Sequence, residues 1–209
     1  MKKIENMSAM EFIKYNIRVE KCRHIMNKDP HTSFVSYGFP TSDEIYHAWK
    51  HVTVDGESVP VIRSGLHVHQ NNATFGCTRL ASRTGAFIVA ERDIIPVIMV
   101  DEYFMAAPSY VQKFIIAHEV AHIKNGDIKI KQSDNLIRSI DIEIKADKRA
   151  SLHIGKDDTI AALEWLISIV SACNGSNKIE AIEELTTRYK AIVNFDPLAK
   201  DKDRRYKEV

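Results

Sequence analysis

The sequence has almost no charge imbalance and no long apolar run. Its 209 residues include 29 Lys and Arg against 28 Asp and Glu, and the net charge of +1 gives no indication of a nucleic-acid or anionic-membrane partner. No window approaches the ~18 consecutive apolar residues that a membrane span requires. Residues 1–10 are polar and lack the apolar stretch of a signal peptide. We therefore expect neither a membrane span nor export.

Cysteine is also scarce. Cys22, Cys77 and Cys173 are odd in number, far apart and without C-x-x-C spacing, so we expect free thiols in a reducing, cytoplasmic compartment. The hydrophobic content of 44% is enough for a core. The length predicts a single domain over residues 1–195, of which 1–64 form an N-terminal extension of unclear role, and a charged, mobile tail over 196–209. Nothing in the sequence predicts the oligomeric state.

The sequence does contain the pattern H-E-x-x-H, from His118 to His122, within the apolar run 111–123. On a helix, residues four apart lie on the same face, so His118 and His122 can present two imidazole nitrogens to one metal ion, with Glu119 beside them. The simpler interpretation is a helix with two surface histidines. The apolar flanks argue against it, because polar side chains without partners are costly in a core.

The ends of this helix are also marked in the sequence. Ser109–Gln112 fits a capping box, and Asn125–Gly126 fits a C-terminal stop. A third metal ligand must then come from further downstream. The metzincin spacing is excluded, because Asn125 and Ile128 stand where that class needs glycine and histidine. The remaining candidates are His153 and an acidic residue.

We prefer Glu143, in the segment Glu143–Asp147, as the third ligand. A helix that opens at Ser133–Asp134 and closes before Gly155 would carry Glu143 and Asp147 on one otherwise apolar stripe. Two carboxylates on such a stripe need a partner, and a metal with its ligand provides one. The alternative is a strand over 140–144 that leaves Glu143 on a solvated face, but the run 145–150 favours the helix.

Together, H-E-x-x-H and the E-x-x-A-D of residues 143–147 resemble the motifs of gluzincin-type zinc metallopeptidases, in particular soluble HtpX-like and ImmA/IrrE-like members. The resemblance covers about residues 97–166. It implies one Zn²⁺ per chain, bound by His118, His122 and Glu143. It also implies that Asp147 orients His118 through a hydrogen bond. Arg188 and Tyr189 are candidates for stabilising the oxyanion, although a solvated arginine is the simpler interpretation.

The other segments predict an α+β, zincin-like fold: a small, mostly antiparallel sheet lobe packed on the H-E-x-x-H helix, followed by a helical C-terminal part. We expect a first helix over 8–26 that buries Met10, Ile13 and Ile17. Strands are expected within 52–62 and 65–100, and helices over 159–173 and 178–193.

Zinc peptidases commonly place a substrate-pairing edge strand shortly before the metal helix. We assign this role to the strand 84–89, through Ala86, Phe87 and Ile88. The sequence therefore predicts a zinc-dependent metalloendopeptidase that hydrolyses peptide bonds of a protein or peptide substrate by a zinc-activated water, with Glu119 as general base. Two alternatives stay open: a non-catalytic zinc-containing binding or structural module, and a narrow regulatory peptidase with one protein substrate.

Overall fold

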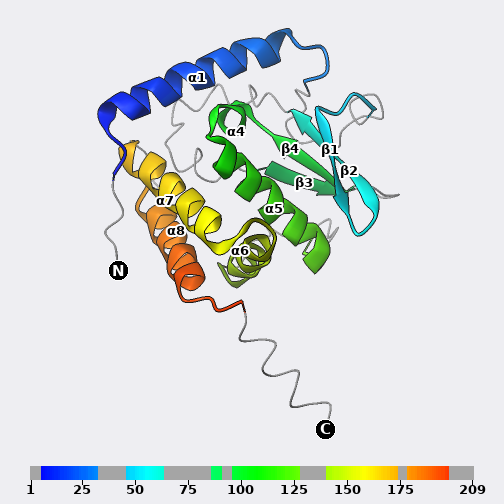
Figure 1. Ribbon diagram of the computed structural model, residues 1–209. Helices are drawn as coiled ribbons and strands as arrows, with labels where there is room; N and C mark the ends of the chain where they lie inside the picture. The colour runs from blue at the N-terminus through cyan, green and yellow to red at the C-terminus, as the bar shows by residue number, and fades with distance from the viewer. Residues whose placement is uncertain are drawn as a thin grey trace.

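The computed structural model describes residues 6–32, 46–63, 86–90, 96–127, 140–173 and 178–197, with residues 86–90 described by their backbone. Its helices and strands are, in chain order, α1 (Ala9–Lys28), β1 (Lys50–Val54), β2 (Glu57–Arg63), β3 (Ala86–Ala90), β4 (Pro96–Val100), α4 (Glu102–Ala106), α5 (Ser109–Asn125), α6 (Ile140–Ile154), α7 (Lys156–Ala172) and α8 (Lys178–Val193). The class is α+β, with a small sheet followed by a helical C-terminal part (Figure 1), as the sequence predicts.

The sheet has four described strands in the order β1-β2-β4-β3. Two of its pairings are antiparallel and the β2–β4 pairing is parallel, so the expectation of a mostly antiparallel sheet is confirmed. Asp55 and Gly56 form the β1–β2 turn with positive φ angles of 51° and 89°. Pro96 is the first residue of β4, where a missing N–H is tolerated. Pro60 lies within β2 without breaking it, and pairing with β4 begins only at Val61.

The core lies between the sheet and the C-terminal helices, with α5 at its centre (Figure 1). α5 contributes Val111, Phe114 and Ile115 to this core, and each is less than 5% exposed. α8 runs over the predicted 178–193 and buries Leu185, Tyr189 and Ile192. The helix that carries the metal motif is therefore buried along the side that packs into the core, which holds its side chains in fixed positions.

The first helix begins as predicted but buries a different face. Ser8 caps α1, and the Ser8 and Glu11 side chains bond each other's backbone N–H in a capping box. The residues expected inside, Met10, Ile13 and Ile17, are 60%, 52% and 51% exposed. The buried side is instead the one that carries Tyr15, whose ring packs edge-on against Trp165 of α7 at 5.2 Å between centroids.

Two other helix N-termini differ from the sequence prediction. α5 starts after Pro108 without a side-chain cap, and Gln112 instead donates to the carbonyls of Met105 and Ala107 at the end of α4. By contrast, the preferred helix is confirmed over 140–144, where α6 is helical, so the strand alternative is wrong. α7 begins at Lys156, three residues before the predicted 159.

The thiols also differ from expectation. Cys22 is free, whereas Cys173 is disulfide-bonded, so the prediction of three free thiols is wrong. Among the described residues no helix has the length and apolar character needed to cross a membrane. The expected helix start at 133–134, much of the segment 65–100 in which strands are expected, and all but two residues of the tail lie outside the described residues.

Candidate metal centre

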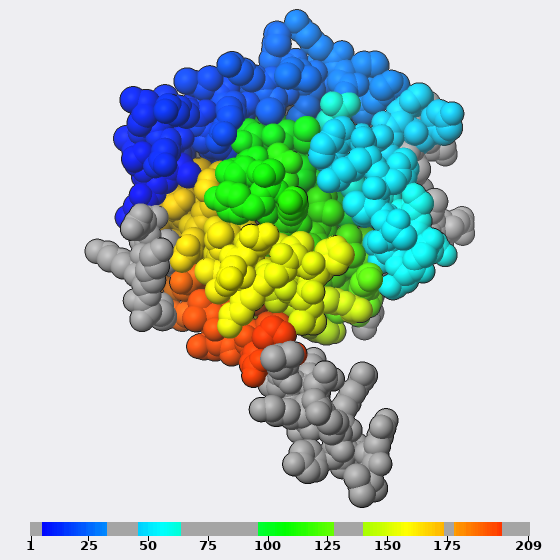
Figure 2. Space-filling model, in the orientation of Figure 1, coloured from blue at the N-terminus to red at the C-terminus, as the bar shows by residue number. Residues whose placement is uncertain are grey.

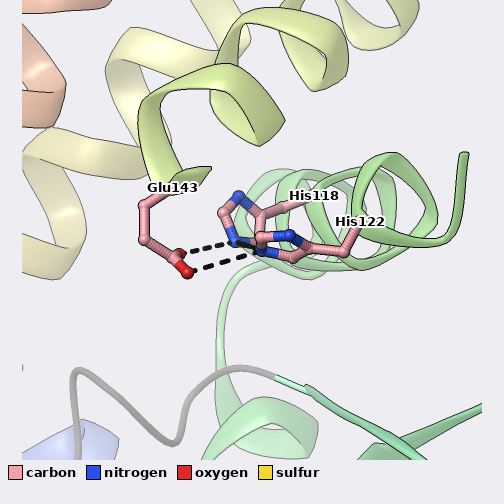
Figure 3. A group of neighbouring side chains, drawn as sticks. All are labelled: His118, His122 and Glu143. Atoms are coloured by element: carbon pink, nitrogen blue, oxygen red, sulfur yellow. Dashed lines mark hydrogen bonds and ion pairs between the residues drawn. The ribbon is translucent and has the colours of Figure 1, made fainter. Parts of the chain in front are cut away.

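His118 and His122 lie one turn apart on α5 and are 6% and 0% exposed. Gly126 ends the helix in the left-handed conformation with φ 68°, and its N–H donates to the last turn. His122 lies in this last turn of α5, and its ring centroid is 4.5 Å from that of His118. Both rings project from one side of the helix toward α6 (Figure 3).

Glu143, from the first turn of α6, points at the two rings (Figure 3). Its Oε2 lies 3.1 Å from His118 Nε2, and its Oε1 lies 3.6 Å from His122 Nε2. The two Nε2 atoms are 2.9 Å apart. Two nitrogens and a carboxylate oxygen thus converge within 4.8 Å in a buried place, and this histidine–carboxylate cluster can hold a metal ion.

The other nitrogen of each ring faces a second carboxylate. His118 Nδ1 donates to Asp147 Oδ1 at 2.7 Å, and His122 Nδ1 donates to Asp127 Oδ2 at 3.0 Å. A carboxylate accepts and cannot donate, so each Nδ1 carries a proton and each Nε2 is available to the cluster. Such carboxylates fix ring orientation and raise ligand basicity. Asp147 was predicted in this role, whereas Asp127 was not.

Arg188 of α8 is the residue that holds Asp147 in place. Its Nε and Nη2 donate to the two Asp147 oxygens at 2.7 and 2.8 Å, a bidentate pair. Arg188 is only 9% exposed, so the simpler interpretation of this residue as a solvated arginine is wrong. The Tyr189 hydroxyl instead donates to Glu164 of α7, 3.2 Å away. Its oxyanion role stays a prediction without a supporting contact.

The charges around the cluster shift its titrating groups. Burial raises the pKa of Asp147, but Arg188 and His118 outweigh burial and bring it down to about 2. Burial likewise raises the pKa of Glu143, yet hydrogen bonds from the two histidines hold it well below its usual range. Burial lowers the pKa of His118, while Asp147 and Glu143 raise it to about 9 overall. The site therefore favours negative carboxylates and positive charge between them.

A shared cation would relieve the repulsion within this cluster. The two ring nitrogens and the two Glu143 oxygens, each carrying a lone pair, repel one another at 2.9 to 3.6 Å unless positive charge lies between them. One proton on His118 Nε2 would join two of these atoms, whereas a metal ion could bind both nitrogens and the carboxylate at once. Glu119, 4% exposed, lies next to His118 on α5. His153, the alternative third ligand, is exposed and lies outside the cluster.

Arg188→Met is expected to lower the free energy of unfolding by about 3–5 kcal/mol, because it leaves the Asp147 carboxylate buried without its bidentate partner. Urea unfolding with a chelator present throughout would measure this apart from metal binding. Lys190→Met, an exposed position on the same helix, should change it by no more than about 0.5 kcal/mol. The double variant with Arg188→Met and Asp147→Asn should lose less unfolding free energy than the sum of the losses in the two single variants. An Arg188→Met protein as stable as wild type would contradict the buried pair.

Comparison with protein-family models, with curated proteins and with solved structures finds no match to this chain.

Proposed function

We propose that the protein is a zinc-dependent metalloendopeptidase with a zincin-like, gluzincin-type site. One observation carries the proposal: three donor atoms converge in a buried place while a carboxylate fixes the far nitrogen of each histidine. A cluster of buried polar groups has no reason to share both features unless it binds a cation. The residues that converge are the ones that the sequence motifs predicted.

The donor set fits zinc. Two imidazole nitrogens and one carboxylate are the usual protein ligands of catalytic zinc, which leaves a fourth position open. Bonds of ~2.0–2.1 Å at tetrahedral angles require ligand atoms about 3.3 Å apart. The two Nε2 atoms are 2.9 Å apart, and the Glu143 oxygens lie 3.1 Å (Oε2) and 3.6 Å (Oε1) from them, so these separations bracket that value. Carboxylate-rich, all-oxygen sites of the kind that calcium and magnesium prefer are a poorer fit.

Each residue then has a distinct role. Zinc, when bound, would lower the pKa of a water toward 7 and polarise a carbonyl group. Glu119 accepts the proton of the attacking water and passes it to the leaving amine. Asp147 and Asp127 hold the two histidines in the tautomer that presents Nε2. Arg188 keeps Asp147 ionised and correctly turned.

The substrate would bind along β3. β3 is an edge strand of the described sheet, antiparallel to β4, and it lies beside α5. An extended peptide can add to such an edge through backbone hydrogen bonds, while pockets select alternate side chains. This supports the predicted role of Ala86, Phe87 and Ile88, whose backbone groups would pair with the substrate.

Asp127→Ala should weaken zinc binding about 10–100-fold, since it removes the acceptor that orients His122. Competition with a chelating dye would measure the dissociation constant. Asp141→Ala is the matched control, because Asp141 is an exposed acid outside the cluster and should leave zinc affinity unchanged. Equal affinities of Asp127→Ala and wild type would show that the His122–Asp127 bond plays no part in binding the metal.

The test of the proposed function is whether the purified protein cleaves peptides in a zinc-dependent reaction that Glu119→Gln abolishes. A peptide library read by mass spectrometry gives the substrate side of the test. Loss of cleavage on chelation and its return with zinc would support the proposal, and cleavage that persists after complete metal removal would overturn it.

A further inference from the structure

A second binding feature lies on the opposite side of α5 from the histidines. A groove of about 660 Å³ runs between β1, α5 and α6. Two residues along a helix are about 200° apart, so Val120, which lines the groove, points away from His118 and His122. Figure 2 shows the surfaces of β1–β2 (cyan), α5 (green) and the α6–α7 region (yellow) meeting on one face. We call this feature the basic groove.

The groove combines an apolar floor with a cationic rim. Its apolar lining is formed by Val52, Ile116, Ala117, Val120, Leu152 and Ile154. Val52 and Val120 are half-buried and Leu152 is 60% exposed, so much of this apolar surface faces solvent. Its cationic side chains are Lys50, Lys113, Lys124 and Arg149.

The concentration of positive charge here is local. The whole chain has nearly equal numbers of basic and acidic residues, 29 against 28, yet the groove lining includes four Lys or Arg and no Asp or Glu. Lys124 pairs with Asp55 at 3.1 Å, but Asp55 is mostly exposed, and such a surface pair is worth little and exchanges readily. The rim therefore retains a strong preference for negative charge.

We propose that the basic groove binds an extended, acidic peptide segment whose apolar side chains lie on the floor and whose carboxylates meet the rim. A peptide is favoured over a compact anion because the groove has apolar lining residues and is flanked by β1, an edge strand of the described sheet that can pair with an added strand. The proposal does not rest on the proposed function, because no residue of the histidine–carboxylate cluster lines the groove.

Fluorescence anisotropy with a labelled octapeptide that alternates glutamate and leucine tests the proposal on the full chain, with the peptide checked as intact by mass spectrometry. Saturable binding that weakens as salt rises is expected. The combined Lys113→Glu and Lys124→Glu variant should bind at least about tenfold more weakly, since both charges are reversed at the rim. Leu152→Ser should also weaken binding, and its high exposure makes it safe for folding.

The matched control is Lys14→Glu with Lys21→Glu, which makes the same change of net charge at exposed positions of α1 and should bind like wild type. An octapeptide of glutamate and serine should bind weakly, because it lacks the apolar side chains. Absence of saturable binding up to about 1 mM peptide would overturn the proposal. The proposal would also be overturned if the groove and α1 variants weakened peptide binding equally. Saturable binding of a fatty acid, without binding of the acidic peptide, would overturn it as well.

Discussion

Glu119→Gln is expected to keep about one zinc per chain and to lose peptide cleavage by at least about 10²–10⁴-fold. The amide has nearly the shape of the carboxylate, so it fits the same 4%-exposed place on α5. His118, His122 and Glu143 are untouched, and metal binding should persist. What the amide lacks is a basic oxygen that can take the proton of the attacking water.

Glu183→Gln makes the same chemical change at an exposed position of α8 and should cleave at the wild-type rate. Elemental analysis and cleavage of a peptide library, on the three proteins side by side, separate the interpretations. A Glu119→Gln protein that cleaves like wild type would rule out Glu119 as general base. Zinc in all three proteins without cleavage of any library peptide, and without cleavage of its own chain during purification, would favour the non-catalytic module.

The cluster could be predicted because its signals are local in sequence. The spacing of His118 and His122 needs only a helix, and the apolar run with its Asn125–Gly126 stop supplies one. The Glu143–Asp147 pattern likewise needs only the helix α6. Each of these helices carries polar side chains on an otherwise apolar face, and packing the two faces together lets those side chains contact one another.

Asp127 and Arg188 could not be predicted in the same way, because their roles depend on tertiary structure. Asp127 follows the left-handed Gly126, which turns the chain back so that its carboxylate reaches His122. The sequence marks the end of the helix, but it does not show where the side chain that follows will point. Arg188 lies 41 residues from Asp147 in sequence. Nothing near it in α8 distinguishes a buried arginine from a solvated one.

The orientation of α1 shows a further limit of periodicity. Met10, Ile13 and Ile17 form one stripe at helical spacing, and Tyr15, Val19 and Met26 form another. The pattern alone cannot choose between them. The choice is made by α4 and α7, where Tyr15 packs against Trp165 and donates to the carbonyl of Tyr103. An amphipathic pattern therefore predicted the helix correctly and its buried face wrongly.

Glu143→Ala should remove zinc from the purified protein. Glu143 is the one acidic member of the cluster, and its loss leaves two neutral histidine nitrogens with no negative charge to balance a divalent ion. The drop in affinity should exceed the 10–100-fold typical of losing an orienting partner, and so exceed that of Asp127→Ala. The nearby Arg188, whose Nη1 lies 3.6 Å from Glu143 Oε2, would further oppose a cation once that carboxylate is gone.

Elemental analysis of wild type, Glu143→Ala and Glu184→Ala, purified alike, measures this directly. Glu184 is an exposed acid near Arg188, so its removal tests whether any nearby carboxylate would have the same effect. About one zinc in wild type and in Glu184→Ala, with none in Glu143→Ala, is the expected result. Zinc retained by Glu143→Ala would move the third ligand elsewhere, and the gluzincin-type assignment would fall even if H-E-x-x-H still bound metal. The three-residue cluster, and not the H-E-x-x-H motif alone, is thus what this measurement tests.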